Sequence, residues 1–275
     1  MTARGVSFRS SFPLILLVFA SCMQRVALSF FFSNNIRSFQ DLSGRKRSSL
    51  VRISARNRRG NRGSDPLAVE VDVEARGYHP IIGSDESGRG CIAGPVVAAS
   101  CCILADLSHY QPIEGVADSK LLSPSDRERI FEEVTSHPNI YAWHISQRSS
   151  QDIDNSNIMI ATMECFKDSI EGLVATLPSN HTAYSIVDGE KTPKLSVGVP
   201  CRPYVGGDKH VYTVSLASIL AKVTRDRLAV AWHDNFPEYG FDQNKGYITP
   251  EHTYAIHKLG PCPLHRRSFK SLRGR

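Results

Sequence analysis

The hydrophobic and polar positions in the body of this chain alternate between a strand pattern and a helix pattern. Short apolar or alternating runs predict strands at 79–84, 92–104, 140–146 and 183–187. Apolar residues spaced three or four apart predict helices at 156–174 and from Leu216 toward Trp232. Strands and helices therefore alternate, which predicts an α/β fold.

Two further helices are indicated by their first residues. Ser123-Pro124 places a capping hydroxyl before a proline, the residue that is favoured at the first helical position. Thr249-Pro250 repeats this arrangement, and Gly260 is a suitable end for the helix that follows. We find no internal repeat and no long linker after residue 77, so we expect one domain at 78–275.

The N-terminal region has a different composition. Residues 12–23 form an apolar run that is too short to span a membrane and fits the core of a signal peptide. Ala27 and Ser29 suit a cleavage site before Phe30. Residues 30–63 are rich in Ser, Arg and Asn and almost free of acids, which is typical of a transit peptide.

A signal sequence followed by a transit-like stretch resembles the bipartite plastid presequences of algae with secondary plastids. A mitochondrial presequence with an unusually apolar start is the alternative. We therefore expect residues 1–77 to be a targeting presequence and a disordered linker, with no stable association of the protein with a membrane.

The charge of the chain is unevenly distributed. The formal net charge is +6, but residues 1–63 carry +11 and residues 64–275 carry −5. Net charge therefore gives no reason to expect that the body binds a polyanion. A nucleic-acid partner would have to be held by local basic patches or by metal ions.

Four carboxylates lie where predicted elements end. Asp85 and Glu86 follow the apolar residues of the first strand, at the start of a glycine-rich turn. Asp188 ends another strand, and Asp208 follows two glycines before a helix. An isolated Asp-Glu pair is usually solvated surface, but the recurrence indicates a cluster of oxygen ligands suited to Mg²⁺ or Mn²⁺. Such a cluster fits phosphodiester cleavage with two metal ions.

Two other segments are candidates for contact with nucleic acid. Gly88, Arg89 and Gly90 form a turn whose backbone could approach a phosphate or a sugar, although a structural hairpin would use the same residues. Arg89-Gly90 stands where a P-loop needs Lys-Ser or Lys-Thr, which argues against nucleotide hydrolysis. Tyr247 lies in a C-terminal stretch, 244–275, that carries +6 and would otherwise be a solvated tail.

Six sequence blocks carry a family resemblance, in this order: SDESGRGCIAGPVVAAS, DSKLLSP, IVDG, GGD with SLASILAKVTRDR, YGFDQNKGYITPEH and GPCPLHRRSF. Together they cover residues 79–270 and resemble type 2 ribonuclease H (ribonuclease HII) of the bacterial and organellar kind. The resemblance implies a ribonuclease-H-like mixed α/β sheet flanked by helices, with a helical C-terminal extension.

The resemblance also implies roles for individual residues. The catalytic, metal-binding carboxylates, holding Mg²⁺ or Mn²⁺, would be Asp85, Glu86, Asp188 and Asp208. The residues that contact the RNA–DNA junction would be Gly88, Arg89 and Gly90, with Tyr247 packed on the deoxyribose beside the ribonucleotide and Lys120 on a phosphate. The implied reaction is hydrolysis on the 5′ side of a ribonucleotide, in RNA–DNA hybrids or in duplex DNA, leaving a 3′-hydroxyl and a 5′-phosphate.

Four residues depart from the usual family pattern: Ser87, Cys91, Leu216 and Asn244. None of them removes a carboxylate or the glycine-arginine-glycine turn, so we expect activity. The expected partners are nucleic acid and a replication clamp, and the expected state is a monomer. Two alternatives are a junction resolvase on a related fold and a protein that binds hybrids without cleaving them.

Overall fold

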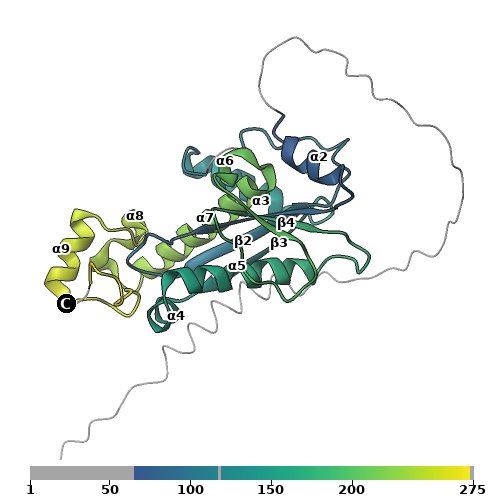
Figure 1. Cartoon of the computed structure of the whole chain (residues 1–275). Helices are drawn as coiled ribbons and strands as arrows, with labels where there is room; N and C mark the ends of the chain where they lie inside the picture. The colour runs from purple at the N-terminus through teal and green to yellow at the C-terminus, as the bar shows by residue number, and fades with distance from the viewer. Residues whose placement is uncertain (1–64, 117–118, 273–275) are drawn as a thin grey trace, which may run out of the picture. The chain divides into compact units, whose positions relative to one another are not determined.

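The centre of the fold is a mixed five-stranded sheet with the strand order β3-β2-β1-β4-β5 (Figure 1). The computed structural model describes residues 65–116 and 119–272. The strands are β1 (Ile81–Ser87), β2 (Val96–Ile103), β3 (Tyr141–Arg148), β4 (Tyr184–Asp188) and β5 (Cys201–Tyr204). The β1–β2 and β2–β3 pairs are antiparallel, whereas β1–β4 and β4–β5 are parallel.

Helices cover both faces of this sheet. They are α2 (Ala68–Glu74), α3 (Pro124–Ser136), α4 (Ser150–Asn155), α5 (Ile158–Val174), α6 (Gly207–His210), α7 (Tyr212–His233), η1 (Pro237–Tyr239), α8 (Phe241–Asn244) and α9 (Pro250–Leu259). Alternate residues of β2 face opposite sides, so Val97 and Ala99 belong to the core under α7, whereas Ala98 packs with Phe166 of α5. Because β2 is buried on both faces, it is a continuous apolar run.

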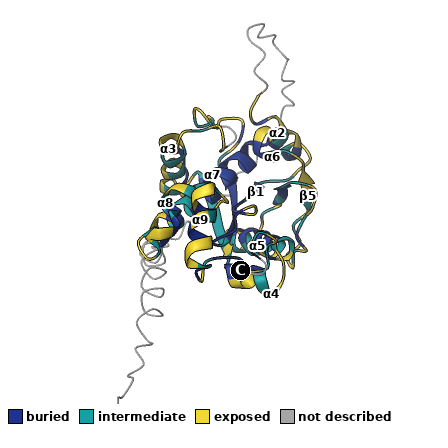
Figure 2. Ribbon diagram, turned by 90° about the vertical axis from the view of Figure 1, so that its left-hand side faces the viewer, coloured by how far each residue is buried: buried dark blue, intermediate teal, exposed yellow. Residues whose placement is uncertain are grey.

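Helix α7 lies unusually close to the sheet. A Cβ atom added at Gly83 of β1 would be 2.2 Å from the backbone of Thr213 in the first turn of α7. Glycine at position 83 therefore lets the helix backbone approach the strand directly. Figure 2 shows α7 as a largely buried helix.

The C-terminal residues form the expected helical extension, with a small core of its own. Phe241 is fully buried there, with its ring stacked on Tyr239 and edge-on to Trp232 at the end of α7. The mixed sheet, its flanking helices and this extension confirm the fold class expected from the sequence.

Most predicted elements are confirmed, but the limits of β1 and β2 differ. β1 continues through Ser87, so Asp85 and Glu86 lie inside the strand, opposite Ala99 and Ala98 of β2, and not in a turn after it. The ladder continues because these small partners leave room for the two carboxylates. β2 begins only at Val96 because Pro95 cannot donate a ladder hydrogen bond.

The fold begins before residue 78, where the sequence analysis placed the start of the domain. Helix α2 lies in the predicted linker, and its Glu70 is 1% exposed. Glu70 Oε1 accepts hydrogen bonds from the backbone N–H (2.7 Å) and the hydroxyl (3.0 Å) of Thr213. The predicted presequence at residues 1–64 lies outside the described residues.

The short elements β5, α4, α6, η1 and α8 were not predicted, because three to six residues carry too little periodicity to distinguish a helix from a strand. Within residues 65–116 and 119–272, no helix combines the length and apolarity that crossing a bilayer requires.

Candidate active site

Parallel pairing brings the first three carboxylates together. Ser84 of β1 lies opposite Val187 of β4, and the same register continued by one residue sets Asp85 beside Asp188. The backbone N–H of Gly207 donates to Asp188 Oδ1 (2.7 Å), which fixes the start of α6 and with it Asp208. Side chains that are 20 to 120 residues apart in the sequence therefore meet at one end of the sheet, as the sequence predicted.

Burial and neighbouring carboxylates raise the pKa values of Asp85, Glu86 and Asp188. Burial, and then the neighbouring Glu86, raise the pKa of Asp85 well above its usual range. Burial also raises the pKa of Glu86, with a further contribution from Asp188 and an opposing one from Arg89. The pKa of Asp188 is raised by burial and by Asp208. Each carboxylate therefore makes its neighbour harder to ionise.

Two basic side chains compensate part of this charge. Lys120 Nζ lies 3.3 Å from Asp208 Oδ2, and Arg89 Nη1 lies 3.5 Å from Glu86 Oε1. In the described part of the chain, no three His, Cys, Asp or Glu side chains converge closely enough to form a ready metal-binding group. The donor set nevertheless suits a hard divalent cation, because partly buried carboxylates that oppose each other's ionisation gain from a shared positive charge.

Ser218 of α7 is a residue that the sequence analysis missed. Its hydroxyl lies beside the Asp85 carboxylate and lowers the pKa of that carboxyl, against the effect of burial. It is also 2.8 Å from the hydroxyl of Ser119, the residue before Lys120. One serine thus connects the strand carboxylate to the segment that carries Lys120. A serine within an apolar helix gives no sequence signal of this role.

The Gly88–Gly90 turn continues directly from β1. Gly88 has a φ of +91°, and a Cβ atom there would be 2.0 Å from Nε of Arg225. At Gly90 a Cβ atom would have no neighbour within 4 Å. The two glycines therefore serve different purposes: Gly88 accommodates a buried side chain, whereas Gly90 leaves open space in front of the backbone.

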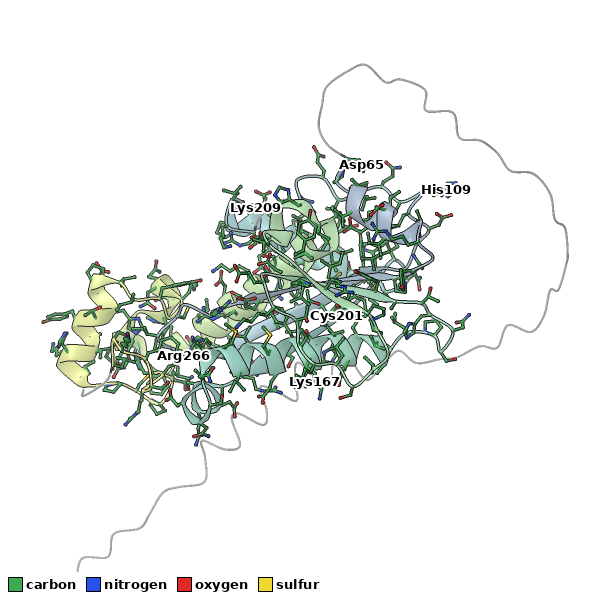
Figure 3. All side chains as sticks on the ribbon, viewed as in Figure 1. Asp65, His109, Lys167, Cys201, Lys209 and Arg266 are labelled. Carbon is green, nitrogen blue, oxygen red and sulfur yellow. The ribbon has the colours of Figure 1, made fainter. Side chains whose placement is uncertain are left out.

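Two fully buried arginines hold this turn. Arg266 donates to the carbonyls of Gly88 (2.8 Å), Arg89 (3.2 Å) and Gly94 (2.9 Å). It lies where the C-terminal helices meet the rest of the fold (Figure 3). The sequence analysis had counted Arg266 in a basic surface stretch, which is wrong because its exposure is 0%.

Arg225 packs against Gly88 of the same turn and joins the stretch after the turn to the segment of Tyr247. Its guanidinium donates to the carbonyls of Ala93 (3.0 Å), Pro95 (3.2 Å) and Lys245 (2.7 Å). Tyr247 is 42% exposed, its ring lies 5.8 Å from the Arg225 guanidinium, and burial and then the neighbouring Cys91 raise its pKa. Tyr247 is thereby brought next to the turn, on a support that the sequence did not reveal.

Comparisons with known proteins identify the family. The family model for ribonuclease HII matches residues 82–272. The chain belongs to the ribonuclease HII family. It is 44% identical over 203 residues to the ribonuclease HII of Burkholderia pseudomallei (strain 668), covering 74% of this chain and 88% of the relative. For the ribonuclease HII of Burkholderia thailandensis the identity is 43% over 220 residues, covering 80% and 96%.

Solved structures of related proteins share the fold. The crystal structure of ribonuclease H2 from Pyrococcus horikoshii has a TM-score of 0.54 and 27% identity, covering 70% of this chain and 95% of that one. The ribonuclease HII in a PCNA complex from Archaeoglobus fulgidus has a TM-score of 0.55 and 24% identity, with the same coverage. As a member of the ribonuclease HII family, the chain is a nuclease of the hydrolase class.

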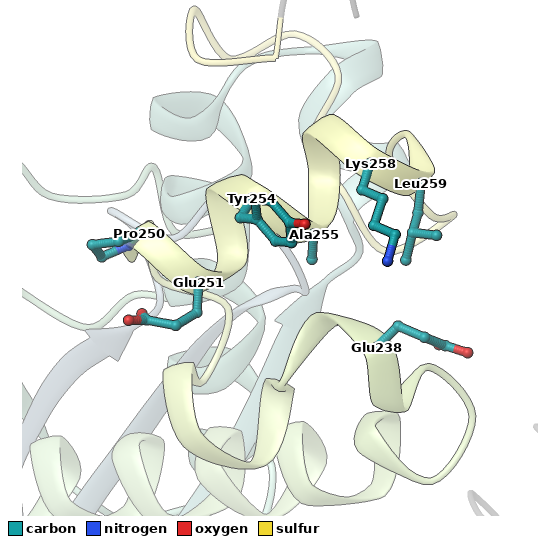
Figure 4. A pocket seen from close by; sticks show the side chains of 7 residues that line it. All are labelled: Glu238, Pro250, Glu251, Tyr254, Ala255, Lys258 and Leu259. Atoms are coloured by element: carbon teal, nitrogen blue, oxygen red, sulfur yellow. The ribbon is translucent and has the colours of Figure 1, made fainter.

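This ribonuclease HII also has a hollow of about 560 Å³ between η1 and α9 (Figure 4). Its lining comprises Glu238, Pro250, Glu251, Tyr254, Ala255, Lys258 and Leu259. None of the predicted site residues lines it, so this hollow is separate from the carboxylate cluster.

Proposed function

We propose that the protein is an endoribonuclease that hydrolyses the phosphodiester on the 5′ side of ribonucleotides, in RNA–DNA hybrids and embedded in duplex DNA. The products would be a 3′-hydroxyl and a 5′-phosphate. The observation that carries the proposal is that two surfaces adjoin. One is the carboxylate cluster at the end of β1, and the other is the Gly88–Gly90 turn, which continues the same strand and lies next to Tyr247.

Asp85, Glu86, Asp188 and Asp208 would hold Mg²⁺ or Mn²⁺. The chemistry that such ions supply is activation of water and stabilisation of charge on the leaving oxygen. Among the chain's own residues, Ser218 would favour the ionised form of Asp85, whose pKa it lowers. Lys120, which lies at Asp208, is placed to meet a phosphate near the cluster.

Recognition of the RNA–DNA junction would depend on the Gly88–Gly90 turn and Tyr247. Open space at Gly90 lets the backbone approach a sugar edge, where Arg89 adds a charged donor. The exposed face of Tyr247 is available to pack on a deoxyribose, which has no 2′-hydroxyl in the way. A ribose followed by a deoxyribose would then fit where two consecutive riboses fit less well.

The test is incision by the purified full chain of a labelled DNA duplex with one internal ribonucleotide, with Mg²⁺, Mn²⁺ or EDTA. We expect metal-dependent cleavage on the 5′ side of the ribonucleotide, lost in Asp85→Asn. Asp72→Asn, on the exposed surface of α2, is the matched control and keeps activity.

Other outcomes of this assay would replace the proposal. Cleavage of an all-DNA four-way junction would favour a resolvase. Binding of the hybrid without cleavage, by folded protein and with every metal, would favour a non-catalytic hybrid-binding protein. Cleavage of long hybrids alone would keep the metal-dependent chemistry and discard the recognition of single ribonucleotides.

We also propose that residues 1–64 direct the protein to an organelle, a plastid in the first place and a mitochondrion as the alternative. The apolar run followed by an arginine- and serine-rich stretch supports this. Fusion of these residues to a fluorescent protein, expressed in an alga with secondary plastids, should place fluorescence in the plastid. Fluorescence that remains in the cytosol would contradict the proposal.

A further inference from the structure

Two buried histidines lie directly behind Tyr247. His252 belongs to α9 and is 0% exposed, and His265 follows α9 and is 2% exposed. Their Nε2 atoms are 3.0 Å apart, and the rings of Tyr239 and Phe241 pack around them. Neither histidine takes part in the proposed chemistry, so their presence in a small apolar core needs another explanation.

The hydrogen bonds around these rings have only one consistent set of directions when both rings are neutral. The carbonyl oxygen of Tyr247 can only accept, so His252 Nδ1, 2.7 Å away, donates to it. His252 Nε2 is then an acceptor, and His265 Nε2 must donate to it. His265 Nδ1 is left as an acceptor. It receives the backbone N–H of Cys262 at 3.0 Å and lies 3.1 Å from the Cys262 thiol, which can also donate to it, whereas the Cys262 carbonyl, 3.3 Å away, receives no proton from it.

The surroundings keep both rings neutral. Burial lowers the pKa of His252. Burial, and then His252, lower the pKa of His265 to about 4. A proton added to either ring would also place two N–H groups face to face, either between the imidazoles or at the Cys262 amide. The chain of hydrogen bonds therefore has a defined order from Cys262 to Tyr247.

The segment before Tyr247 needs such support because its backbone is unusual. Lys245 has a φ of +50° and Gly246 a φ of +79°, both left-handed. A non-glycine residue in this region is strained and persists only where its surroundings hold it. The Gly246 carbonyl accepts from Ile92 N–H (2.9 Å), and the Tyr247 carbonyl is held by His252, so the backbone is fixed on both sides of the Tyr247 peptide.

We propose that His252 and His265 are positioning residues whose two neutral imidazoles transmit a fixed hydrogen-bond direction to the Tyr247 carbonyl and hold the Tyr247 ring at the junction sugar. This inference rests on the proposed function, because it takes Tyr247 to be the residue that contacts the sugar. Its tests are chosen so that the two can fail separately.

Asparagine and glutamine distinguish the two nitrogens of each ring. The asparagine amide nitrogen occupies roughly the place of histidine Nδ1, and the glutamine amide nitrogen that of Nε2. His252 must donate from Nδ1, whereas His265 must donate from Nε2. His252→Asn and His265→Gln therefore keep the donor that each position needs, while His252→Gln and His265→Asn remove it.

A preference for asparagine at position 252 and for glutamine at position 265 distinguishes this proposal from simple packing. If the histidines only fill space, glutamine, which is closer to histidine in size, is the better replacement at both positions. If they form the chain described above, asparagine is better at 252 and glutamine at 265. Equal damage by both members of each pair would also overturn the proposal.

The activity measured is kcat/KM of the full chain on the single-ribonucleotide duplex, relative to that on a long hybrid. We expect His252→Gln and His265→Asn to lower this ratio roughly tenfold, mainly through KM, because a buried carbonyl loses its donor. His252→Asn and His265→Gln should keep this ratio within about twofold of that of the parent protein. His257→Asn, an exposed position on the same helix, is the control.

Imidazole ¹⁵N chemical shifts give a second readout that does not depend on substrate. At neutral pH, His252 should carry its proton on Nδ1 and His265 on Nε2, and the reverse tautomers or a charged ring would overturn the proposal. Tyr247→Ala distinguishes a failure of the proposed function from a failure of the positioning proposal. If it leaves the substrate ratio unchanged, the sugar contact of Tyr247 is wrong and the positioning role falls with it, whatever the tautomers are.

Discussion

Asp85 is costly to ionise in the absence of a cation. It is 5% exposed, in a strand, with Glu86 next to it and Asp188 beside it on β4. Ala99 opposite provides space but no counter-charge. A carboxylate in this environment reduces stability, so its presence is best explained by a ligand that needs it.

The first prediction concerns pH and divalent metal. The folded-state pKa values of Asp85, Glu86 and Asp188 are raised above their ordinary values. The protonated forms of these groups therefore stabilise the folded protein. This stabilisation is fully present below their ordinary pKa values and is lost as pH rises through their folded-state pKa values. Mg²⁺ binds the ionised form, so it should raise Tm more at about pH 8 than at about pH 5.

Asp85→Asn is the check on this prediction. The variant should melt at a higher temperature than the parent in EDTA at neutral pH, and the shift caused by Mg²⁺ should shrink. An equal Mg²⁺ shift at both pH values, or an unchanged shift in the variant, would mean that the ion binds elsewhere.

The second prediction distinguishes the two glycines of the turn. In Gly88→Ala the new Cβ meets the buried Arg225 at 2.0 Å and takes a φ of +91°. The cost is about 2–4 kcal/mol, which lowers Tm by roughly 4–16 °C. Gly90→Ala meets nothing within 4 Å and should leave Tm almost unchanged while it weakens cleavage at the junction. Thermal unfolding and incision of both variants test this, and similar Tm losses would contradict it.

At the scale of elements, α2 caps the central helix. Val211 precedes α7 without a side-chain capping hydrogen bond of its own. The Glu70 carboxylate supplies this cap from α2 through Thr213. An acidic group at a helix N-terminus also favours the helix dipole. A segment that the sequence analysis assigned to a linker is thus part of the support for α7.

We expect Glu70→Ala to destabilise the protein by about 1–3 kcal/mol, because the Thr213 N–H and hydroxyl lose a buried acceptor. At this size the loss corresponds to a decrease in Tm of roughly 2–10 °C. The control Asp72→Ala, on the exposed face of the same helix, should change Tm by less than about 2 °C. An equal effect of both variants would show that α2 acts only through its helicity.

At the scale of the whole molecule, buried arginines connect the C-terminal extension to the catalytic sheet. Arg266 reaches back across more than 170 residues of sequence to the Gly88–Gly94 turn. Because its planar guanidinium satisfies three carbonyls at once, it fixes their relative positions. The surface proposed to contact nucleic acid is therefore assembled from both ends of the described chain.

Arg266→Lys should lose this arrangement, because an ammonium cannot satisfy three carbonyls in the same directions. We expect a loss of about 2–3 kcal/mol in the free energy of unfolding in urea. The exposed neighbour gives the control: Arg267→Lys should stay within about 0.5 kcal/mol. A stable Arg266→Lys variant would mean that the extension docks mainly through its apolar core.

The sequence by itself determined the elements with strong periodicity and the type of chemistry. The apolar spacing of 156–174, the Ser123 and Thr249 caps and the recurrence of carboxylates next to glycine are local features, visible without a fold. Two kinds of structural detail were not predicted. Short elements such as β5 have too few residues for a pattern. β1 continues past its last apolar residue because it pairs with β2.

Only the tertiary structure decided how these pieces act together. Burial of Arg225 and Arg266, the cap from Glu70 and the order of the His252–His265 chain depend on which distant backbone groups lack a partner. The sequence alone does not distinguish a buried arginine from a solvated one. Their difference arises from the desolvation of carbonyls that only folding brings together.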